Sequence, residues 1–518
     1  MTTRQHHLLT SLVLLMSIMS AEAQTTSDVP RLVVSVVVDQ LRTDYLDAFA
    51  PLYGEEGFRR LMREGRVYQR AEYPFAHPDR ASAVACLMSG ATPYENGIVG
   101  ERWLSRENLN PQYCVGEGTP ASLAVSTLTD ELKLSTAGRS LVFSVAPQSD
   151  AAVLAAGHAA DGAFWLDDET GQWVTSAYYG YPTWLTAYNR AEHAANTIKK
   201  LLWTPINDRV AEFNYFVSDE ARKPFRHQFR GDRQFREFKA SALVNEEVTD
   251  FVGHCLQNTA MGDDASTDYL SVTYYAGNYD HHTVADYPME LQDTYVRLDY
   301  QIERLLRMVE EKVGRERVLF VLTSTGYCDA ERSDGDLARY RIPTGEFNIT
   351  RAQGLLNMYL SAVYGQSQYI EGSMGNQLYF DLKAIEQRAL NLSQVLERSA
   401  EFLIRLSGVR DVYTSTRLTL GLGTASVRAL RNAYNPRHSG DILIQVSPGW
   451  TLVNEQTGER RQQRDSYMTF PLVFYGMNLE PQVVTDPVTV DHLAPTVARC
   501  LRIRAPSASS TAPLMMSN

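Results

Sequence analysis

The sequence predicts an α/β fold with a doubly wound, mostly parallel central sheet. Residues 33–38 are β-branched apart from one serine, which is typical of a strand buried on both faces. Further apolar runs that we predict to be strands lie at 140–146, 152–156, 269–275, 318–323, 441–446 and 471–476. Helical segments separate many of these runs, and strands that alternate with helices favour a parallel sheet covered on both faces.

The first residues have the features of a secretory signal peptide. Arg4 precedes an apolar run over residues 8–19, and Ala21-Glu22-Ala23 offers a small-x-small cleavage site. We therefore expect residues 1–23 to be removed and the mature chain to be exported, to a periplasmic or extracellular location. No later apolar run reaches the roughly 18 residues that a membrane helix needs, so we expect no transmembrane segment.

The charge and the cysteines exclude some functions. The 518 residues carry a net charge of -12, with acids and bases interspersed. This argues against a nucleic-acid partner, because phosphate backbones demand clustered Lys and Arg. The five cysteines lack the paired spacing of zinc sites. An oxidising compartment allows one or two disulfides, which the sequence does not assign, and the odd count leaves at least one thiol free. The cysteines are Cys86, Cys114, Cys255, Cys328 and Cys500.

We expect one α/β domain over residues 24–504, with two insertions. The segment from about 164 to 264 mixes aromatic residues, charges and turns, and the segment from about 345 to 440 contains helices between predicted strands. Residues 505–518 are rich in Ser, Ala and Pro, and we expect them to be a disordered tail.

Asp39 follows the first predicted strand directly. In open α/β sheets ligands bind at the carboxyl ends of the strands, which makes this carboxylate a site candidate. Asp is also a good N-cap for the helix expected to follow, and this stretch alone supports both interpretations equally. At a second helix start, Asp79 and Arg80 lie where backbone N–H groups favour anions.

Several segments resemble the alkaline phosphatase superfamily, in the branch of the bacterial phosphate-irrepressible alkaline phosphatases, which is related to the nucleotide pyrophosphatase/phosphodiesterases. The segments are residues 32–45, 89–100, 293–299, 434–441 and 491–496. They occur in the family's order from about Arg31 to about Ile503, so the resemblance implies the family's fold. Family members hold two zinc ions with Asp and His ligands, and a Thr or Ser nucleophile lies between the metals.

The resemblance also implies which residues stand at the family's site positions. Asp39 falls on a metal-ligating aspartate and His282 on a metal-ligating histidine, so these two ligands remain. Counting back from residues 89–93 without a gap, the nucleophile position is occupied by Arg80. A guanidinium group cannot attack phosphorus, and its charge repels zinc. Ser82 lies two residues into the helix, and we interpret it as a packing serine.

The other family positions carry different residues. Asn278 replaces a ligating aspartate, Thr325 and Gly326 replace a ligating Asp-His pair, and Arg460 lies nearest to the last missing histidine. The substrate-binding positions are changed as well. They hold Gln148 and Asp150 in place of a Lys-x-Arg pair, and Glu101 in place of an asparagine.

Our leading hypothesis is therefore an exported protein with an alkaline phosphatase-like fold that is catalytically inactive, has a binding or scaffold role and needs no cofactor. Arg80 would then supply the positive charge that a zinc ion once supplied, so its side chain is expected to contact Asp39. The alternative is a metal-dependent phosphomonoesterase or phosphodiesterase with a rearranged zinc site. Its ligands would come from Asp39, His282, Asp280, His281 and either His77 or Asp79.

A binding role leaves three partner classes open, namely a protein, a glycan or a phosphorylated ligand. The aromatic residues between Phe164 and Tyr188 either contact such a partner or pack the insertion onto the sheet. Large aromatic side chains gain much from burial, which favours packing. An exposed, contiguous aromatic patch would instead favour contact with a partner.

Overall fold

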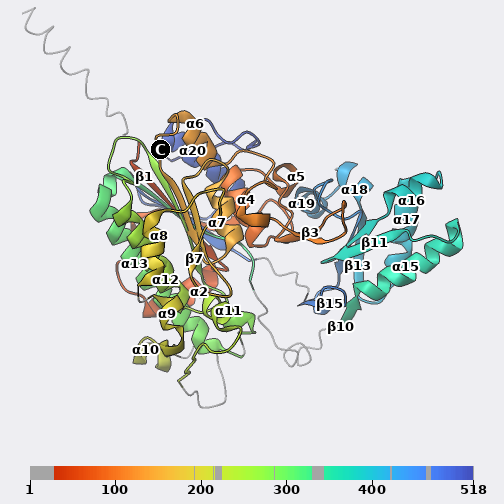
Figure 1. Ribbon diagram of the computed structural model, residues 1–518, viewed down its shortest axis with the longest axis horizontal. Helices are drawn as coiled ribbons and strands as arrows, with labels where there is room; N and C mark the ends of the chain where they lie inside the picture. Colours follow the sequence, from red (N-terminus) through yellow and green to blue (C-terminus); the bar gives the residue numbers. More distant parts are fainter. Residues whose placement is uncertain are drawn as a thin grey trace, which may run out of the picture.

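The structure is a computed structural model that describes residues 29–191, 193–213, 215, 224–284, 286–328, 343–420, 423–462 and 468–516. A large α/β unit carries a smaller lobe that projects from one side (Figure 1). The predicted signal peptide, residues 1–23, lies outside the described residues.

A ten-stranded sheet forms the centre of the large unit, in the order β18-β2-β17-β9-β1-β8-β5-β6-β7, with β19 paired to β2. The central strand β1 pairs in parallel with both β8 and β9. All eight of its residues are buried. The predicted fold class is therefore confirmed. The strands are β1 Leu32–Asp39, β2 Arg66–Glu72, β5 Val142–Ala146, β6 Gly162–Leu166, β7 Trp173–Val174, β8 Asp268–Tyr275, β9 Val318–Ser324, β17 Phe470–Gly476, β18 Gln482–Val484 and β19 Val488–Thr489.

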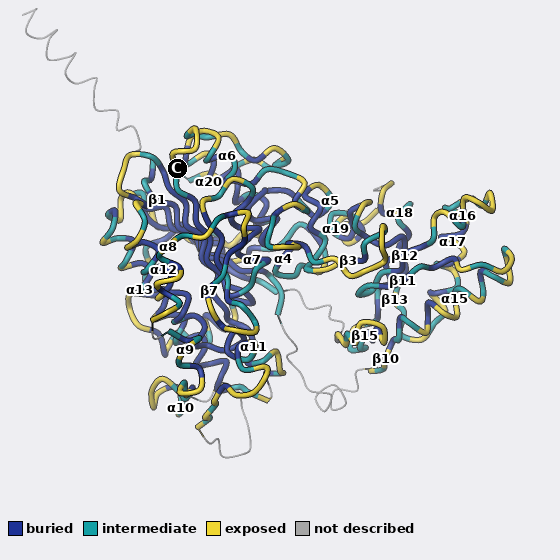
Figure 2. The backbone as a smooth tube through the Cα atoms, in the orientation of Figure 1, coloured by how far each residue is buried: buried dark blue, intermediate teal, exposed yellow. Residues whose placement is uncertain are grey.

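Helices cover both faces of this sheet. Val34, Val36 and Val38 of β1 belong to one hydrophobic cluster, and Val33 and Val37 belong to another, because successive strand side chains alternate between faces. Figure 2 shows the sheet as the main buried region. The first cluster includes residues of α2 Thr43–Ala48, α3 Phe58–Glu64, α8 Thr183–Arg190, α9 Ala194–Thr197, α10 Asp208–Glu212, α11 Gln234–Lys239, α12 Leu243–Asn258 and α13 Pro288–Val313. The second includes residues of α4 Arg80–Ser89, α6 Leu128–Ser135, α7 Ser149–Ala156 and α20 Leu493–Leu501.

The lobe comprises the described residues between 343 and 462 and has a hydrophobic core of its own. A four-stranded sheet, β11-β12-β14-β13, and a three-stranded sheet, β10-β15-β16, form its centre. The strands are β10 Gly345–Asn348, β11 Ile370–Met374, β12 Gln377–Phe380, β13 Val409–Thr414, β14 Ile442–Val446, β15 Trp450–Asn454 and β16 Glu459–Gln462. The helices are α15 Ile349–Tyr364, α16 Leu382–Gln387, α17 Leu392–Leu403, α18 Ser415–Leu420 and α19 Ala425–Ala433.

Two predicted strands are placed differently in the structure. Residues 152–156 are the end of helix α7, whose small side chains are buried on all sides. An entirely apolar run does not distinguish a buried helix from a buried strand. Residues 441–446 do form a strand, but β14 belongs to the lobe and not to the central sheet.

The predicted insertion over residues 164–264 is in large part integral to the large unit. It includes most of β6 as well as β7, both in the central sheet, and α12, which packs on that sheet. Phe164, Trp173 and Tyr188 are buried, so packing accounts for these aromatic residues. Tyr178 and Tyr181 are exposed.

The chain's last residues differ from the predicted disordered tail. Ser507 N donates to Ser126 Oγ at 2.8 Å, and Thr511 Oγ1 donates to the carbonyl oxygen of Asp491 at 2.8 Å. Leu514 and Met516 pack against the second hydrophobic cluster. These two apolar side chains and the hydrogen bonds hold the Ser- and Pro-rich segment on the surface, up to residue 516.

The lobe is attached to the large unit through the segments 92–106 and 434–441. Arg106 lies just beyond the short strand β3 (Arg102–Leu104) and binds Asp441 with Nη2 at 3.1 Å and Nη1 at 3.2 Å. The ring of His438 stacks on that of Trp103, with centroids 4.4 Å apart. Segment 434–441, which is one of the segments resembling the family, therefore connects the two parts. Two further short elements are α5 Pro93–Asn96 and β4 Pro111–Tyr113.

Cys86, Cys114, Cys255 and Cys500 are free thiols. Cys86, Cys114 and Cys255 are buried. Among the described helices, none is both long enough and apolar enough to cross a membrane.

Candidate functional site

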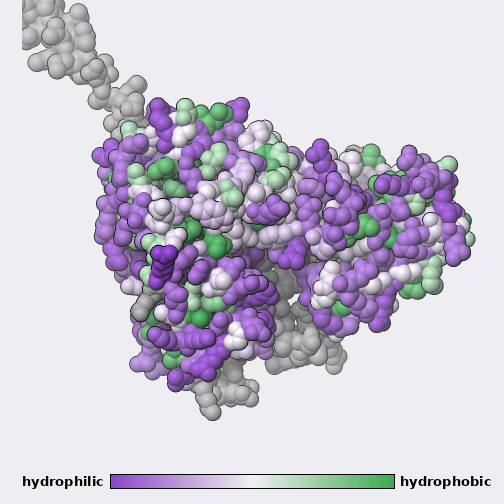
Figure 3. Space-filling model, viewed as in Figure 1, coloured by the Kyte–Doolittle hydropathy of each residue, from purple (hydrophilic) through white to green (hydrophobic). Residues whose placement is uncertain are grey.

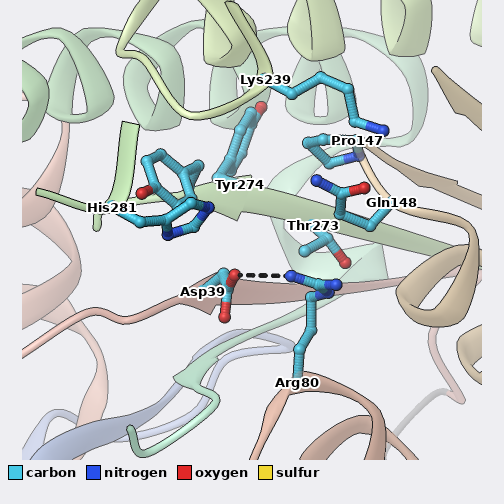
Figure 4. A pocket seen from close by; sticks show the side chains of 9 residues that line it. Asp39, Arg80, Pro147, Gln148, Lys239, Thr273, Tyr274 and His281 are labelled. Carbon is cyan, nitrogen blue, oxygen red and sulfur yellow. Dashed lines mark hydrogen bonds and ion pairs between the residues drawn. The ribbon is translucent and has the colours of Figure 1, made fainter. Parts of the chain in front are cut away.

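Asp39 lies at the carboxyl end of β1 and is the centre of the candidate site. Thr325 Oγ1 donates to its Oδ1 at 2.8 Å, and the Tyr327 hydroxyl donates to its Oδ2 at 3.2 Å. Arg80 Nη1 donates to the same Oδ2 at 3.4 Å (Figure 4). Burial raises the pKa of the Asp39 carboxyl, and the Arg80 charge opposes that shift. Helix α2 begins at Thr43 with Arg42 as its N-cap, so the interpretation of Asp39 as a helix cap is wrong.

Arg80 connects Asp39 to a second carboxylate. It is the first residue of α4, and its Nε donates to Asp150 Oδ1 at 2.9 Å. Asp150 is fully buried in the first turn of α7. The predicted contact between Arg80 and Asp39 is therefore present. The single guanidinium group compensates two buried carboxylates, and without such a partner a buried charge is costly.

Little free space remains around these charged groups. The pocket between them has a volume of about 10 Å³, which is room for about one water molecule. Figure 4 shows Arg80 and Asp39 pointing toward each other, with His281 on the Asp39 side and Gln148 on the Arg80 side. The lining residues are Asp39, Arg80, Pro147, Gln148, Lys239, Thr273, Tyr274, Tyr275 and His281.

Two residues that the sequence analysis missed belong to this site. Lys239, at the end of α11, is buried, and its Nζ donates to Asp168 Oδ1 at 2.5 Å and to the Leu166 carbonyl oxygen at 2.9 Å. Burial lowers the pKa of Lys239, and the Asp168 carboxylate opposes that shift. Tyr327 stands two residues after Thr325 in a segment that was compared with the family. The sequence comparison therefore included Tyr327, but the family motif assigns no role to a tyrosine at this position.

Strained backbone surrounds the same edge of the sheet. Gln40, His77, Asp280 and His281 have positive φ values of 67°, 54°, 45° and 58°. Gln40 directly follows Asp39, and its N–H donates to Thr325 Oγ1 at 3.0 Å. Such conformations cost free energy in residues other than glycine and cluster at functional sites. The surrounding packing thus holds this edge in one arrangement.

The start of α4 offers no nucleophile in place of Arg80. Ser82 N donates to Asp79 Oδ1 at 2.9 Å and Asp79 N donates to Ser82 Oγ at 3.0 Å, which forms a capping box. Ser82 Oγ also donates to Asp79 Oδ1 at 2.7 Å. The other Asp79 oxygen accepts the Glu101 N–H at 2.6 Å. Ser82 and Asp79 therefore stabilise the helix start. The Glu101 side chain is about half exposed and does not line the pocket.

The predicted ligand His282 does not line the pocket, and its neighbour His281 does. The imidazole of His282 is half exposed, with Nε2 3.7 Å from Asp280 Oδ2. Asn278 Nδ2 donates to the His282 carbonyl oxygen at 2.7 Å, so this amide fixes the turn. Asp280 Oδ1 accepts a bond from Arg233 at 2.9 Å. Arg460 forms an ion pair with Glu346 within the lobe.

The residues present do not fit the family's two zinc ions. Both oxygens of Asp39 already accept hydrogen bonds from Thr325, Tyr327 and Arg80. Each zinc ion requires about four N, O or S ligands. The part of the chain that the structure describes contains no group of three or more His, Cys, Asp or Glu residues arranged to hold a metal.

Comparison with known families gives a clear assignment. Residues 33–468 match the model of the family described as type I phosphodiesterase / nucleotide pyrophosphatase. The chain belongs to this family. It is 28% identical to alkaline phosphatase PhoV of Synechococcus elongatus, over 93% of this chain and 91% of PhoV. It is also 28% identical to alkaline phosphatase PafA of Elizabethkingia meningoseptica, over 95% of each chain.

The phosphodiesterase family assignment agrees with the fold. The crystal structure of wild-type alkaline phosphatase PafA superimposes with a TM-score of 0.80 and 26% identity, covering 94% of this chain and 98% of that chain. The likeness therefore extends over both the large unit and the lobe. Against that background, the charged cluster of Arg80, Asp39 and Asp150 is the feature that distinguishes the site of this family member from the zinc sites that the resemblance implies.

Proposed function

We propose that this chain is a catalytically inactive, exported member of the type I phosphodiesterase family, with a binding or scaffold role. The observation that carries the proposal is the Arg80 guanidinium group, which lies between Asp39 and Asp150. It stands at the family's nucleophile position and supplies the positive charge that Asp39 requires.

The hydroxyl groups around Asp39 support the same conclusion. Thr325 Oγ1 donates to Asp39 and accepts the Gln40 N–H. Tyr327 also donates to Asp39, and Ser82 is held in the α4 capping box. Each hydroxyl thus already has a structural partner, and the carboxylates that accept from them are themselves bound, Asp39 by Arg80 and Asp79 by the N–H groups of Ser82 and Glu101.

The role that remains is recognition of a protein, a glycan or a phosphorylated ligand. The narrow pocket favours contact on the surface over complete enclosure of a phosphate group. Exposed Tyr178 and Tyr181 provide aromatic surface for such a contact.

A hydrolysis assay tests the proposal. Purified mature chain with added zinc is incubated with an aryl phosphate monoester and an aryl phosphate diester, beside alkaline phosphatase PhoV as the active control. We expect no turnover above buffer for this chain and none for its Asp39→Asn variant. Turnover by the wild-type chain that is lost in Asp39→Asn contradicts the proposal and favours the metal-dependent hydrolase with a rearranged site.

Export is tested separately by N-terminal sequencing of the protein recovered from its native host. Cleavage after Ala23 leaves Gln24 as the first residue, in a periplasmic or extracellular fraction. Recovery of the protein from inside the cell, with Met1 still present, contradicts export.

A further inference from the structure

His158 lies between two groups that only accept hydrogen bonds. Its Nδ1 is 2.8 Å from Asp130 Oδ2, and its Nε2 is 3.1 Å from the carbonyl oxygen of Leu123. A neutral imidazole has one N–H and one acceptor nitrogen, so it satisfies only one of these two oxygens. The imidazolium form has an N–H on both nitrogens and satisfies both. The contacts around His158 therefore fit its positively charged form.

Asp130 supplies the negative charge beside this ring. Its Oδ1 accepts the N–H groups of His158 at 2.7 Å and Ala159 at 3.0 Å, and its Oδ2 accepts the Thr127 N–H at 2.8 Å. Hydrogen bonds to a carboxylate favour its charged form. Burial raises the pKa of Asp130, but the bonds from His158 and Thr127 outweigh burial and bring the pKa below its ordinary value of 3.8.

The cluster joins three segments of the large unit. Asp130 lies in the first turn of α6, Leu123 lies in the loop before α6, and His158 follows the end of α7 that is opposite to Asp150. The cluster is therefore separate from the site around Asp39. The His158 side chain is 36% exposed, so protons from the solvent reach the ring. Figure 3 shows residues of mixed hydropathy on this part of the large unit, where Figure 1 labels α6.

Asp130 is the charged group that faces His158. The hydroxyl of Tyr178 donates to the His158 carbonyl oxygen, and that of Tyr179 donates to the Gly157 carbonyl oxygen, each at 2.8 Å. Burial raises the pKa of both phenols, so they stay neutral over the range in which a histidine titrates. The other charged side chains of α6 and of residues 157–161 form ion pairs elsewhere, namely Lys133 with Asp161 and Glu131 with Arg504.

We propose that His158 and Asp130 form a pH-sensitive clamp. It holds the loop at residues 120–124 against α6 while His158 is protonated, and it releases this loop when His158 loses its proton. The neutral ring keeps one N–H, on Nδ1, because the carboxylate is the stronger acceptor. Nε2 then turns a lone pair toward the Leu123 carbonyl oxygen. Leu123 is buried, and a buried acceptor without a donor is costly.

The direction of the pH effect follows from the charges. The bond to Asp130 raises the pKa of His158 above its ordinary value of 6.5, and burial opposes that shift. The folded state therefore binds this proton more tightly than the unfolded state. The stabilisation is fully present below pH 6.5, and it is lost as the pH rises through the raised pKa. At the acid end, the contribution of Asp130 is lost as the pH falls through its own lowered pKa.

The loop that the clamp holds lies beside the attachment of the lobe. Ala124 N donates to the Asn96 carbonyl oxygen at 2.9 Å, and the Gly97 carbonyl oxygen accepts a bond from His438 Nδ1 at 2.6 Å. Asn96 and Gly97 belong to segment 92–106, through which the lobe is attached. Opening of the loop breaks the Ala124 bond, so the clamp makes one support of this attachment depend on pH.

NMR of the mature chain with isotope-labelled histidine tests the charge state, and His158→Gln identifies the His158 signals. We expect a titration midpoint above pH 6.5 and, in the neutral ring, a proton on Nδ1. In Asp130→Asn the midpoint falls, because the ring loses its negative partner. Asp161→Asn is the matched control, since it removes the same charge from a carboxylate that pairs with Lys133, and it leaves the midpoint unchanged.

Hydrogen exchange of the Ala124 N–H measures the opening of the loop, with His158→Gln at each pH correcting for the pH dependence of exchange itself. We expect the relative protection of the wild-type chain to fall about fivefold as the pH rises through the midpoint, which corresponds to one lost hydrogen bond. A midpoint at or below 6.5 overturns the proposal, as does a midpoint that Asp130→Asn leaves in place. Protection of Ala124 that is the same on both sides of the midpoint also overturns it.

Discussion

The large unit and the lobe differ in how they accommodate side chains that are unfavourable where they lie. At the edge of the central sheet, Asp39 and Asp150 are buried charges, and Arg80 compensates both within the same chain. In the lobe, helix α15 exposes the apolar side chains of Leu355 and Met358 to solvent. The edge of the central sheet thus satisfies its buried charges within one chain, whereas the outer surface of the lobe leaves apolar side chains in contact with solvent.

The largest expected effect comes from removing the charge that Asp39 and Asp150 share. Arg80→Met leaves two buried carboxylates without their cation, and loss of one partner in such a buried cluster costs about 3–5 kcal/mol. Urea unfolding monitored by tryptophan fluorescence measures this loss. Arg351→Met is the control, because the Arg351 side chain is 75% exposed and its ion pair contributes at most about 1 kcal/mol. Equal stabilities of the two variants would refute the role given to Arg80.

The next effect concerns the attachment of the lobe. Arg106→Met removes both bonds to Asp441, whose side chain is 8% exposed, and we expect a loss of about 2–4 kcal/mol. Because this pair joins the two parts, calorimetry is expected to show the lobe unfolding in a transition of its own. A single transition at the wild-type temperature would show that the parts do not depend on this ion pair.

A pH dependence of stability is expected from the large unit. Asp299 accepts the N–H groups of Gly54 and Phe58, and burial raises its pKa from 3.8 to about 6. The folded state therefore holds this proton more tightly than the unfolded state. The resulting stability is fully present below pH 3.8, and it is lost as the pH rises through about 6.

The expected loss over that range is at most about 3 kcal/mol, since each pKa unit corresponds to about 1.4 kcal/mol. Urea unfolding at closely spaced pH values measures it. In Asp299→Asn, which cannot ionise, this part of the slope disappears. A variant with the wild-type slope would assign the pH dependence to another group.

The smallest expected losses of stability come from removing the two hydroxyl groups that donate to Asp39. Thr325→Val removes a 2.8 Å bond to Asp39 together with the acceptor of the Gln40 N–H, for a cost of about 2 kcal/mol. Tyr327→Phe removes a bond of 3.2 Å and costs about 1 kcal/mol. Chemical unfolding of both variants measures which of them loses more stability. The reverse order would show that the phenol, and not the threonine, holds the carboxylate.

Much of the fold and part of the site were predictable from the sequence. Buried strands such as β1 and β9 follow from continuous apolar runs, and the contact of Arg80 with Asp39 follows from charge compensation. The strand at 441–446 was assigned to the wrong sheet, because an apolar run does not reveal which sheet receives it.

The missed site residues depend on geometry that is not local in sequence. Lys239 reaches the pocket because α11 packs beside the turn that carries Asp280, whose N–H donates to the Ala240 carbonyl oxygen. Counting residues selected His282, whereas the positive φ values at Asp280 and His281 turn the other ring toward the pocket. Such a backbone conformation depends on tertiary packing, so residue spacing alone does not show which of the two rings lines the pocket.

Zinc binding tests the central claim most directly. Isothermal titration of Zn²⁺ into the metal-free mature chain is compared with the same titration into its Asp39→Asn variant. Because Arg80, Thr325 and Tyr327 occupy the oxygens of Asp39, we expect no stoichiometric uptake with a dissociation constant below about 1 µM in either protein. Uptake of one or two zinc ions per wild-type chain at that affinity, abolished in Asp39→Asn, would contradict it.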